Sequence, residues 1–135
     1  MFYASIKHAN IATCYEIKIN EHNQISFSLE RGRGTLHGYI HHCTIDQRIK
    51  EFKIVFKEVL LGLEYLHNRN ILHGDIKPTN IIIYKDNIKL IDFGAIRVKT
   101  DKGYPINLTT YNFASPEDMI YQVYGPSNDM FALGI

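Results

Sequence analysis

The sequence is poor in cysteine, has no long apolar run and carries almost no net charge, and each shortage excludes a class of protein. Its two cysteines, Cys14 and Cys43, lie far apart without the spacing of metal ligands, so we expect reduced thiols in a cytoplasmic, intracellular protein. No apolar run approaches the roughly 20 residues of a membrane span, and residues 1–15 lack the pattern of a secretory signal. The net charge of +1 favours neither nucleic acid nor a membrane as a partner.

The length and composition fit one globular domain. At 135 residues the chain has room for one modest hydrophobic core. A hydrophobic content of 45% is ordinary for a folded protein. The chain contains no internal repeat and no low-complexity segment.

The first part of the chain predicts a β-hairpin followed by a glycine-rich connector. Residues 13–20 and 24–29 alternate apolar and polar side chains, which predicts two paired strands with one buried face. Residues 30–35 have the sequence ERGRGT and form the expected connector. A short helix is expected over residues 36–41.

A long amphipathic helix is predicted to begin at Thr44 and to run to about His67. Thr44 and Gln47 have the spacing of a capping box, in which each side chain accepts from the backbone of the other residue. The apolar residues that follow recur at helical spacing, and lysine and glutamate fill much of the opposite face. These apolar residues are Ile49, Phe52, Phe56, Val59, Leu60, Leu63 and Leu66.

Beyond this helix the pattern predicts a loop, a second hairpin and two helices. Residues 71–80 are expected to form the loop, and residues 81–84 and 88–91 form two short apolar strands joined by a turn. Pro116 opens a short helix, and a further helix begins near Asn128.

Chemically useful side chains flank the second hairpin. Asp75, Lys77 and Asn80 precede it and Asp92 follows it, so the hairpin folds the two groups back onto one edge. A carboxylate and an amide can hold a hard divalent cation through oxygen ligands. The other carboxylate and the lysine then remain for a substrate hydroxyl and a transferring phosphate. This is the inventory of phosphoryl transfer, which depends mostly on positioning and charge neutralisation.

These motifs resemble the catalytic region of eukaryotic-type protein kinases of the serine/threonine type. The family pattern is HRDxKxxN, then DFG, then APE, and here it reads HGDIKPTN at 73–80, DFG at 92–94 and SPE at 115–117. The resemblance implies an α+β, protein-kinase-like fold. It consists of a mostly helical large lobe with a catalytic-loop hairpin, preceded by the last two strands of the small lobe and truncated at both ends. Residues 1–30 are then a small-lobe remnant and hinge, and residues 31–135 a partial large lobe.

The resemblance assigns a role to each polar residue of the two motifs. Asp75 matches the catalytic base, and Lys77, two residues later, matches the lysine that neutralises the γ-phosphate of ATP. Asn80 and Asp92 match the two magnesium ligands, so the implied cofactors are ATP and Mg²⁺. His73 and Phe93 match members of the family's internal hydrophobic stack.

The resemblance also assigns roles to further residues, and for several of them a second interpretation stays open. Ile82 would lie under the adenine ring, although a plain role in the strand core fits it equally well. The backbone from Glu30 to Gly32 would offer hinge groups to the edge of the base. Thr110 is expected to contact the base and the lysine, with its neighbours as competing alignments. Asp129 either braces the catalytic loop or caps a helix.

A separate cluster could indicate a metal site. It consists of His37, His41, His42 and Cys43, and its first two members have the i, i+4 spacing that can bind zinc on a helix. No distant second pair completes a set of four ligands, so surface histidines are the preferred interpretation.

The sequence also departs from the family pattern. Gly74 replaces the arginine that normally receives a phosphorylated activation loop, which argues against switching by loop phosphorylation. The same variant occurs in kinases resembling the vaccinia-related group. No Gly-x-Gly-x-x-Gly loop and no ATP-fixing lysine strand precede the first hairpin.

Two functions follow from the pattern and its departures. The first is a serine/threonine protein kinase that transfers the γ-phosphate of ATP to protein hydroxyls. The alternative is a catalytically inactive, truncated homologue that acts as a binding or decoy module. The expected partners are a protein substrate, ATP and another kinase or a chain that supplies the missing lobe.

Overall fold

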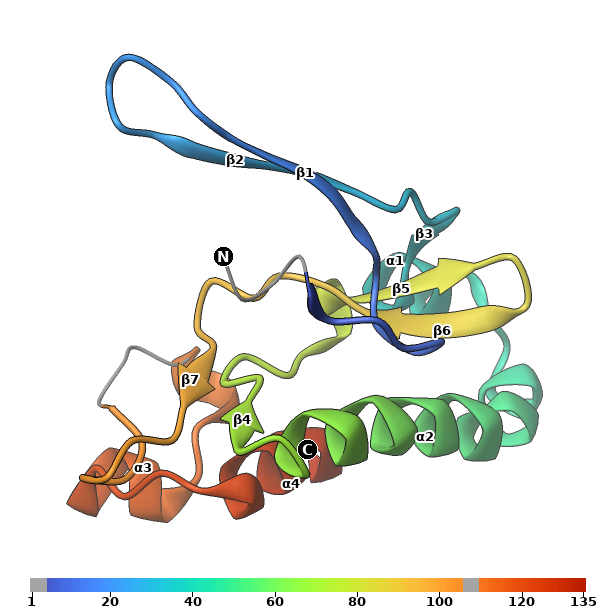
Figure 1. Ribbon diagram of the computed structural model, residues 1–135. Helices are drawn as coiled ribbons and strands as arrows, with labels where there is room; N and C mark the ends of the chain where they lie inside the picture. Colours follow the sequence, from blue (N-terminus) through green and yellow to red (C-terminus); the bar gives the residue numbers. More distant parts are fainter. Residues whose placement is uncertain (1–4, 106–109) are drawn as a thin grey trace.

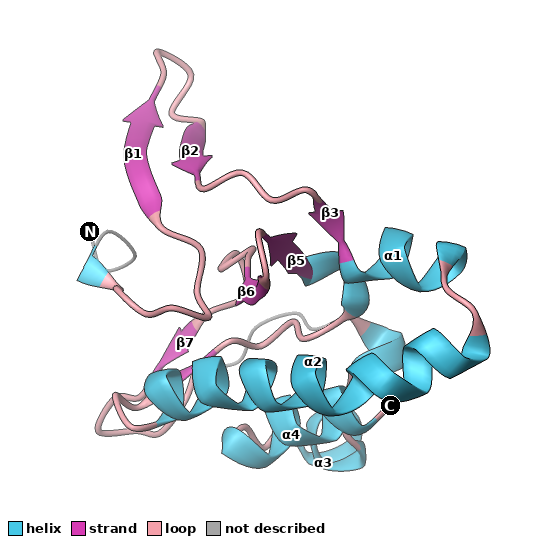
Figure 2. Ribbon diagram, turned by 90° about the vertical axis from the view of Figure 1, so that its right-hand side faces the viewer, coloured by secondary structure: helices cyan, strands magenta, loops and turns pink. Residues whose placement is uncertain are grey.

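The computed structural model describes residues 5–105 and 110–135 of an α+β protein. Among these residues three small antiparallel sheets form, β1–β2, β3–β5–β6 and β4–β7. Strands β4 and β6 pack against one long helix, α2, whereas β1–β2 projects away from it (Figures 1 and 2). The elements are β1 (Cys14–Ile19), β2 (Ile25–Leu29), β3 (Gly34–Thr35), α1 (Leu36–His42), α2 (Ile45–His67), β4 (Ile71–Leu72), β5 (Ile81–Tyr84), β6 (Asn87–Leu90), β7 (Arg97–Val98), α3 (Pro116–Tyr121) and α4 (Pro126–Gly134), with 3₁₀ turns at Pro78–Asn80 and Tyr111–Phe113. Among the helices of the described residues, none has the length and apolar character needed to cross a bilayer.

Helix α2 starts where the sequence predicts it. The Thr44 side chain accepts from the Gln47 amide, and the Gln47 side chain accepts from the Thr44 amide, so the capping box is confirmed. Burial along the helix begins only at Val59, because the elements that cover it, β4, β6 and α4, pack along its C-terminal part. Ile49 and Phe52, which the periodicity places on the buried face, are therefore exposed.

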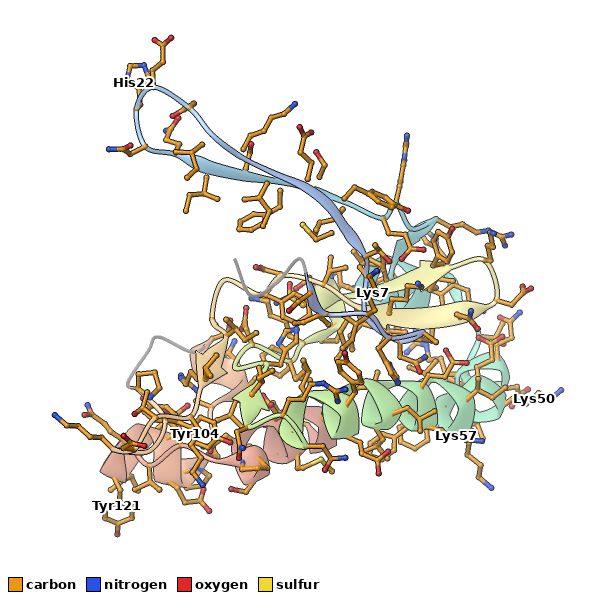
Figure 3. The ribbon with its side chains drawn as sticks, in the orientation of Figure 1. Lys7, His22, Lys50, Lys57, Tyr104 and Tyr121 are labelled. Carbon is orange, nitrogen blue, oxygen red and sulfur yellow. The ribbon has the colours of Figure 1, made fainter. Side chains whose placement is uncertain are left out.

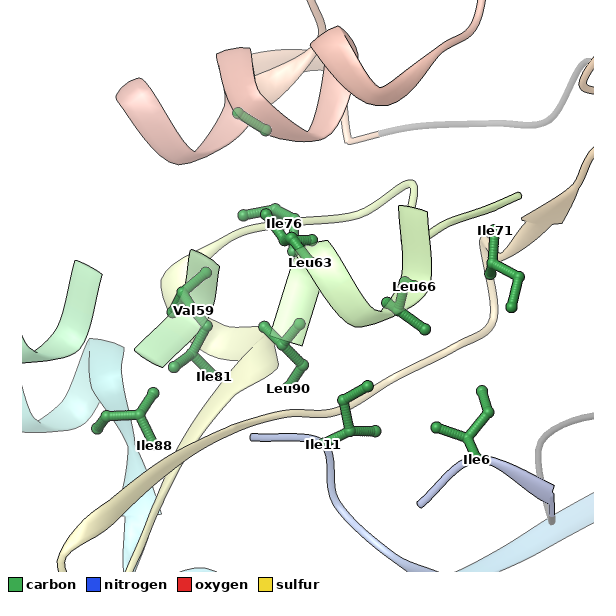
Figure 4. Close-up of a cluster of buried hydrophobic side chains, with 11 residues drawn as sticks. Ile6, Ile11, Val59, Leu63, Leu66, Ile71, Ile76, Ile81, Ile88 and Leu90 are labelled. Atoms are coloured by element: carbon green, nitrogen blue, oxygen red, sulfur yellow. The ribbon is translucent and has the colours of Figure 1, made fainter. Parts of the chain in front are cut away.

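The hydrophobic core joins α2 to the second hairpin and to the N-terminal segment (Figure 4). Residues 6–12 lie beside β6: the Leu90 amide donates to the Asn10 carbonyl at 2.9 Å, and the Ala12 amide donates to the Leu90 carbonyl at 2.9 Å. The Asn10 side chain adds a bond to the Ile88 carbonyl at 3.0 Å. The core consists of Ile6, Ile11, Val59, Leu63, Leu66, Ile71, Ile76, Ile81, Ile88, Leu90 and Ala132.

The first hairpin forms as predicted, but its predicted buried face is wrong. Strands β1 and β2 pair Ile17 with Phe27 and Ile19 with Ile25. Ile19, Ile25 and Phe27 are nevertheless 58%, 53% and 51% exposed. The reason is that a two-stranded ribbon buries a face only when another element covers it, and this hairpin projects from the body as an arm with His22 near its tip (Figures 1 and 3).

The second hairpin, β5–β6, also forms as predicted and is buried. Tyr84 pairs with Asn87 across a two-residue turn, in which Lys85 has a φ of +54°. The predicted loop before it is only partly irregular. Its first residues form β4, which pairs antiparallel with β7, and its last residues form a 3₁₀ turn. Helix α4 begins at Pro126, two positions before the predicted start.

Candidate active site

The base of the β5–β6 hairpin brings the two polar motifs together. The Ile91 amide donates to the Asn80 carbonyl at 2.9 Å, so the end of the first motif is tied to the residue before Asp92. The ring of His73 lies 3.0 Å from the Ile91 carbonyl through Nε2. Both motifs therefore meet at one edge, as the sequence predicts.

Asp75 is the centre of the local hydrogen-bond network. Lys77 Nζ lies 2.7 Å from Asp75 Oδ2, and Asn80 Nδ2 donates to the same oxygen and to the Asp75 carbonyl, each at 2.9 Å. The Thr110 hydroxyl donates to the other carboxylate oxygen, Oδ1, and accepts from Lys77 Nζ at 2.9 Å. Asp75, Lys77, Asn80 and Thr110 are thus brought into direct contact.

The network decides the charge state of Asp75. Burial alone raises the pKa of its carboxyl, but the hydrogen bonds from Lys77, Thr110 and Asn80 outweigh that effect and hold the pKa below its ordinary value. The carboxylate is therefore ionised at neutral pH.

His73 is a buried, neutral imidazole. A carbonyl can only accept, so Nε2 donates to the Ile91 carbonyl, and Nδ1 accepts from the Asp75 amide at 3.3 Å. Burial lowers the pKa of the ring more than the nearby carboxylates raise it. The ring centroid lies 5.1 Å from that of Phe93, in agreement with the predicted stack.

Asp129 holds the loop that contains His73 and Gly74 through hydrogen bonds to its backbone. Its carboxylate accepts from the His73 amide and from the Gly74 amide, each at 2.9 Å, and lies 2.8 Å from Nε2 of His67. Burial raises the pKa of this carboxyl, but the bond from His67 and the two backbone bonds outweigh it and lower the pKa. The N-cap of α4 is Gly125, so Asp129 holds the backbone of His73 and Gly74 and does not cap the helix. Sequence reasoning missed His67; its only signal was its place in the last turn of α2.

Gly74 occupies a position that excludes a side chain. Its φ is +80°, and a Cβ built on it would lie 2.4 Å from the carbonyl oxygen of Ala95. The family arginine is replaced at a position where the backbone of Ala95 lies so close to Gly74 that no side chain fits. The resemblance of this variant to the vaccinia-related group stays a prediction.

Asp92 and Asn80 are the candidates for holding a cation. Asp92 is exposed, has a φ of +63° and accepts from the Gly94 amide at 3.2 Å through Oδ1. The amide nitrogen of Asn80 is used by Asp75, so its oxygen is the atom left for a ligand role. In the described ranges no group of three or more His, Cys, Asp or Glu side chains could hold a metal by itself. One carboxylate and one amide suit Mg²⁺, which usually shares its coordination with substrate phosphates.

Residues 30–32 and Ile82, which are expected to bind adenine, lie where the hinge passes beside β5. A Cβ on Gly32 would lie 2.9 Å from Cβ of Ile82, and the Arg33 amide donates to the Ile83 carbonyl at 2.7 Å. Ile82 is buried against this segment, so both of its predicted roles remain compatible with its place. The side chain of Glu30 binds Lys89, a residue that sequence reasoning did not single out.

The histidine cluster of α1 is not assembled into a metal site in the part of the chain that is described. The rings of His37 and His41 pack edge to face with centroids 4.6 Å apart, on an exposed surface of the helix.

Comparison with known families identifies the family to which the chain belongs. The family described as "Protein kinase domain" matches residues 1–135. The chain belongs to the protein kinase family. Kinase relatives include the CTD kinase subunit alpha of Saccharomyces cerevisiae, which is 32% identical over 96% of this chain and 25% of that protein. The PAS domain-containing serine/threonine-protein kinase of Mus musculus is 34% identical over 98% of this chain and 10% of that protein.

The kinase fold is confirmed by a solved structure as well. The crystal structure of the yeast RNA Pol II CTD kinase CTDK-1 complex superposes with a TM-score of 0.82 at 31% identity, over 98% of this chain and 44% of that one. The chain spans a quarter or less of the length of these two curated kinases.

Proposed function

We propose that this chain carries the phosphoryl-transfer residues of a serine/threonine protein kinase, which moves the γ-phosphate of ATP to a protein hydroxyl. One observation carries the proposal: the Thr110 hydroxyl lies between Asp75 and Lys77, donating to the carboxylate and accepting from the ammonium. An alcohol in this position has its proton directed at a base and its oxygen beside a cation. A substrate serine or threonine hydroxyl needs the same two neighbours.

Each protein group then has a defined task. Asp75, ionised at neutral pH, orients the hydroxyl and accepts its proton. Lys77 neutralises charge on the phosphoryl group that is being transferred. Asn80 holds the carboxylate of Asp75 in place through Nδ2, which keeps the base correctly oriented.

Asn80 and Asp92 would hold Mg²⁺ through their side-chain oxygens. The ion, when bound, supplies neutralisation of the phosphate charge. The backbone of residues 30–32 and the side chain of Ile82 would bind the adenine of ATP. Residues 1–30 would then serve as a small-lobe segment with the hinge, and residues 31–135 as large-lobe structure.

A binding or decoy module is the second candidate, and the β1–β2 arm favours it. Its apolar face, formed by Ile17, Ile19, Ile25 and Phe27, is largely exposed, and such a face suits a protein partner. That partner would be another kinase or a chain that supplies further kinase structure.

The test is phosphate transfer from ATP–Mg²⁺ to a generic protein substrate by the wild-type chain and by matched aspartate variants. We expect Asp75→Asn to lower kcat by roughly 100- to 10,000-fold, since the proton acceptor is lost. Asp92→Ala should abolish transfer, and Asp86→Asn, in the exposed turn of the β5–β6 hairpin, should leave the rate unchanged.

The opposite results separate the two candidates. Equal rates for the wild type and Asp75→Asn would contradict the proposed mechanism. A wild-type chain without transfer, but with capture of a partner kinase that Asp92→Ala leaves intact, would instead support the binding module.

A further inference from the structure

A buried ion pair between lysine and glutamate lies outside the Asp75 network, between the hinge and β6. Lys89 Nζ lies 2.7 Å from Glu30 Oε2, and the two side chains are only 9% and 8% exposed. By contrast, the pair that joins Lys18 to Glu16 in β1 is 67% and 50% exposed. A pair excluded from water to this degree is held in one geometry, whereas an exposed pair contributes little.

Further contacts fix both partners. The Thr13 amide donates to the same Glu30 oxygen at 3.1 Å, and the Glu30 amide donates to the Thr13 carbonyl at 2.9 Å. Lys89 Nζ lies 4.8 Å from the centroid of the Tyr84 ring. Although burial raises the pKa of the Glu30 carboxyl, the bond from Lys89 and the Thr13 amide outweigh it, so the pKa is lowered and the glutamate is charged.

The Lys89–Glu30 pair lies next to residues 30–32, the segment that is expected to bind adenine. Lys89 stands opposite Ile82 in the β5–β6 register, so both side chains lie on the same face of the hairpin. The hinge follows β2 directly and runs along this hairpin to β3 (Figure 1). It is anchored at its start by Glu30 and at its end by the bond from the Arg33 amide to the Ile83 carbonyl. The backbone of residues 31–32 is thus held in place at both ends, by the contacts of Glu30 and of Arg33.

We propose that Lys89 and Glu30 form a positioning pair that holds the hinge backbone in the orientation that hydrogen-bonds adenine. The inference rests on the proposed function, since adenine is the expected ligand of residues 30–32. Neither side chain takes part in phosphate transfer. The pair determines instead how strongly the site prefers adenine to a base with a different edge, because backbone donors and acceptors discriminate only when they are fixed in place.

The test uses Lys89→Met, which keeps the length and apolar stem of the side chain but removes its charge. The kinetics of ATP are compared with those of inosine triphosphate, whose base lacks the amino group of adenine. We expect KM for ATP to rise about tenfold, the effect of one hydrogen bond's free energy, with kcat and the KM for inosine triphosphate unchanged. Lys89→Arg, which keeps the cation, should retain the preference for ATP, and the control Lys18→Met should change nothing.

The result that overturns the proposal is an equal change for both nucleotides, or a fall in kcat alone, because a merely structural role would act in that way. Amide hydrogen exchange gives a readout that needs no nucleotide. In Lys89→Met the amides of Thr13 and Arg33 should exchange faster, and in Lys18→Met they should not. Unchanged exchange contradicts the positioning pair, whereas a wild-type chain that uses neither nucleotide contradicts the proposed function.

Discussion

The molecule contains two isoleucine-rich β-hairpins that share a local sequence pattern and a turn conformation but differ in burial. Both turn through a residue with positive φ, Asn23 at +56° in β1–β2 and Lys85 at +54° in β5–β6. The first hairpin projects as an arm with its apolar face exposed, whereas the second is buried and carries the two polar motifs at its base. The comparison shows that alternation and turn chemistry determine strand pairing, while burial depends on distant elements.

The distant elements can be named for β5–β6. Strand β3 pairs with β5 on one side, the N-terminal segment bonds to β6 on the other, and α2 covers the hairpin. For the arm, the described residues supply only the pairing of β1 with β2 within its sheet.

The largest expected effect is a difference in stability between one apolar truncation in each hairpin. Leu90→Ala removes a fully buried side chain and should lower the free energy of unfolding by about 2–5 kcal/mol, through lost burial and the cavity left behind. Phe27→Ala removes a side chain that is half exposed and should change it by less than about 1 kcal/mol. Urea unfolding followed by circular dichroism measures both. Similar losses would mean that the arm is covered in solution.

A smaller difference is expected for the backbone of the catalytic loop. Gly74→Ala introduces a Cβ that overlaps the Ala95 carbonyl at a φ of +80°, while Gly103→Ala meets nothing within 4 Å at a φ of +92°. Both variants carry backbone strain of about 1–3 kcal/mol, and only Gly74→Ala adds the steric overlap. We therefore expect the lower melting temperature for Gly74→Ala in differential scanning calorimetry, and equal values would contradict the close approach.

Lowering the pH should reveal how much the buried carboxylate of Asp129 contributes to stability. The pKa of Asp129 is lower in the folded chain than in the unfolded one, so its contribution to stability is present above about pH 4 and is lost as the pH falls through the folded value. Asp129→Asn is less stable at neutral pH but loses this part of the acid dependence. The slope of unfolding free energy against pH below about pH 4 should thus be shallower in the variant, and parallel slopes would be inconsistent with the lowered pKa.

The smallest expected effect on stability concerns the arm. Ile25→Lys replaces an exposed apolar side chain and should change stability by within about 0.5 kcal/mol, while reducing self-association at high concentration, since the apolar face is interrupted. Ser26→Lys, on the opposite face, adds the same charge and should leave association unchanged. Sedimentation velocity measures both, and an identical response of the two variants would show that charge alone is responsible.

Sequence reasoning succeeded where the signal was local and failed where the partner was distant. The capping box of Thr44 and Gln47 forms as predicted. Asp75, Lys77 and Asn80 also lie within a single segment, and the structure brings them into contact. His67 meets Asp129 across 62 positions and Lys89 meets Glu30 across 59, and no pattern within either segment marks such a meeting. The exposure of the arm could not be predicted for the same reason, because alternation indicates an apolar face without saying what covers it.

The bonding of the N-terminal segment to β6 has a consequence for how the chain folds. Asn10 bonds to the Ile88 carbonyl across 78 positions, so residues 6–12 are synthesised well before the strand they pair with. At roughly 5–20 residues per second, the interval is on the order of ten seconds, during which residues 6–12 lack the strand to which they bond. Closing so long a loop is slow, and completion of the core is therefore expected late, after α2 and the second hairpin have formed.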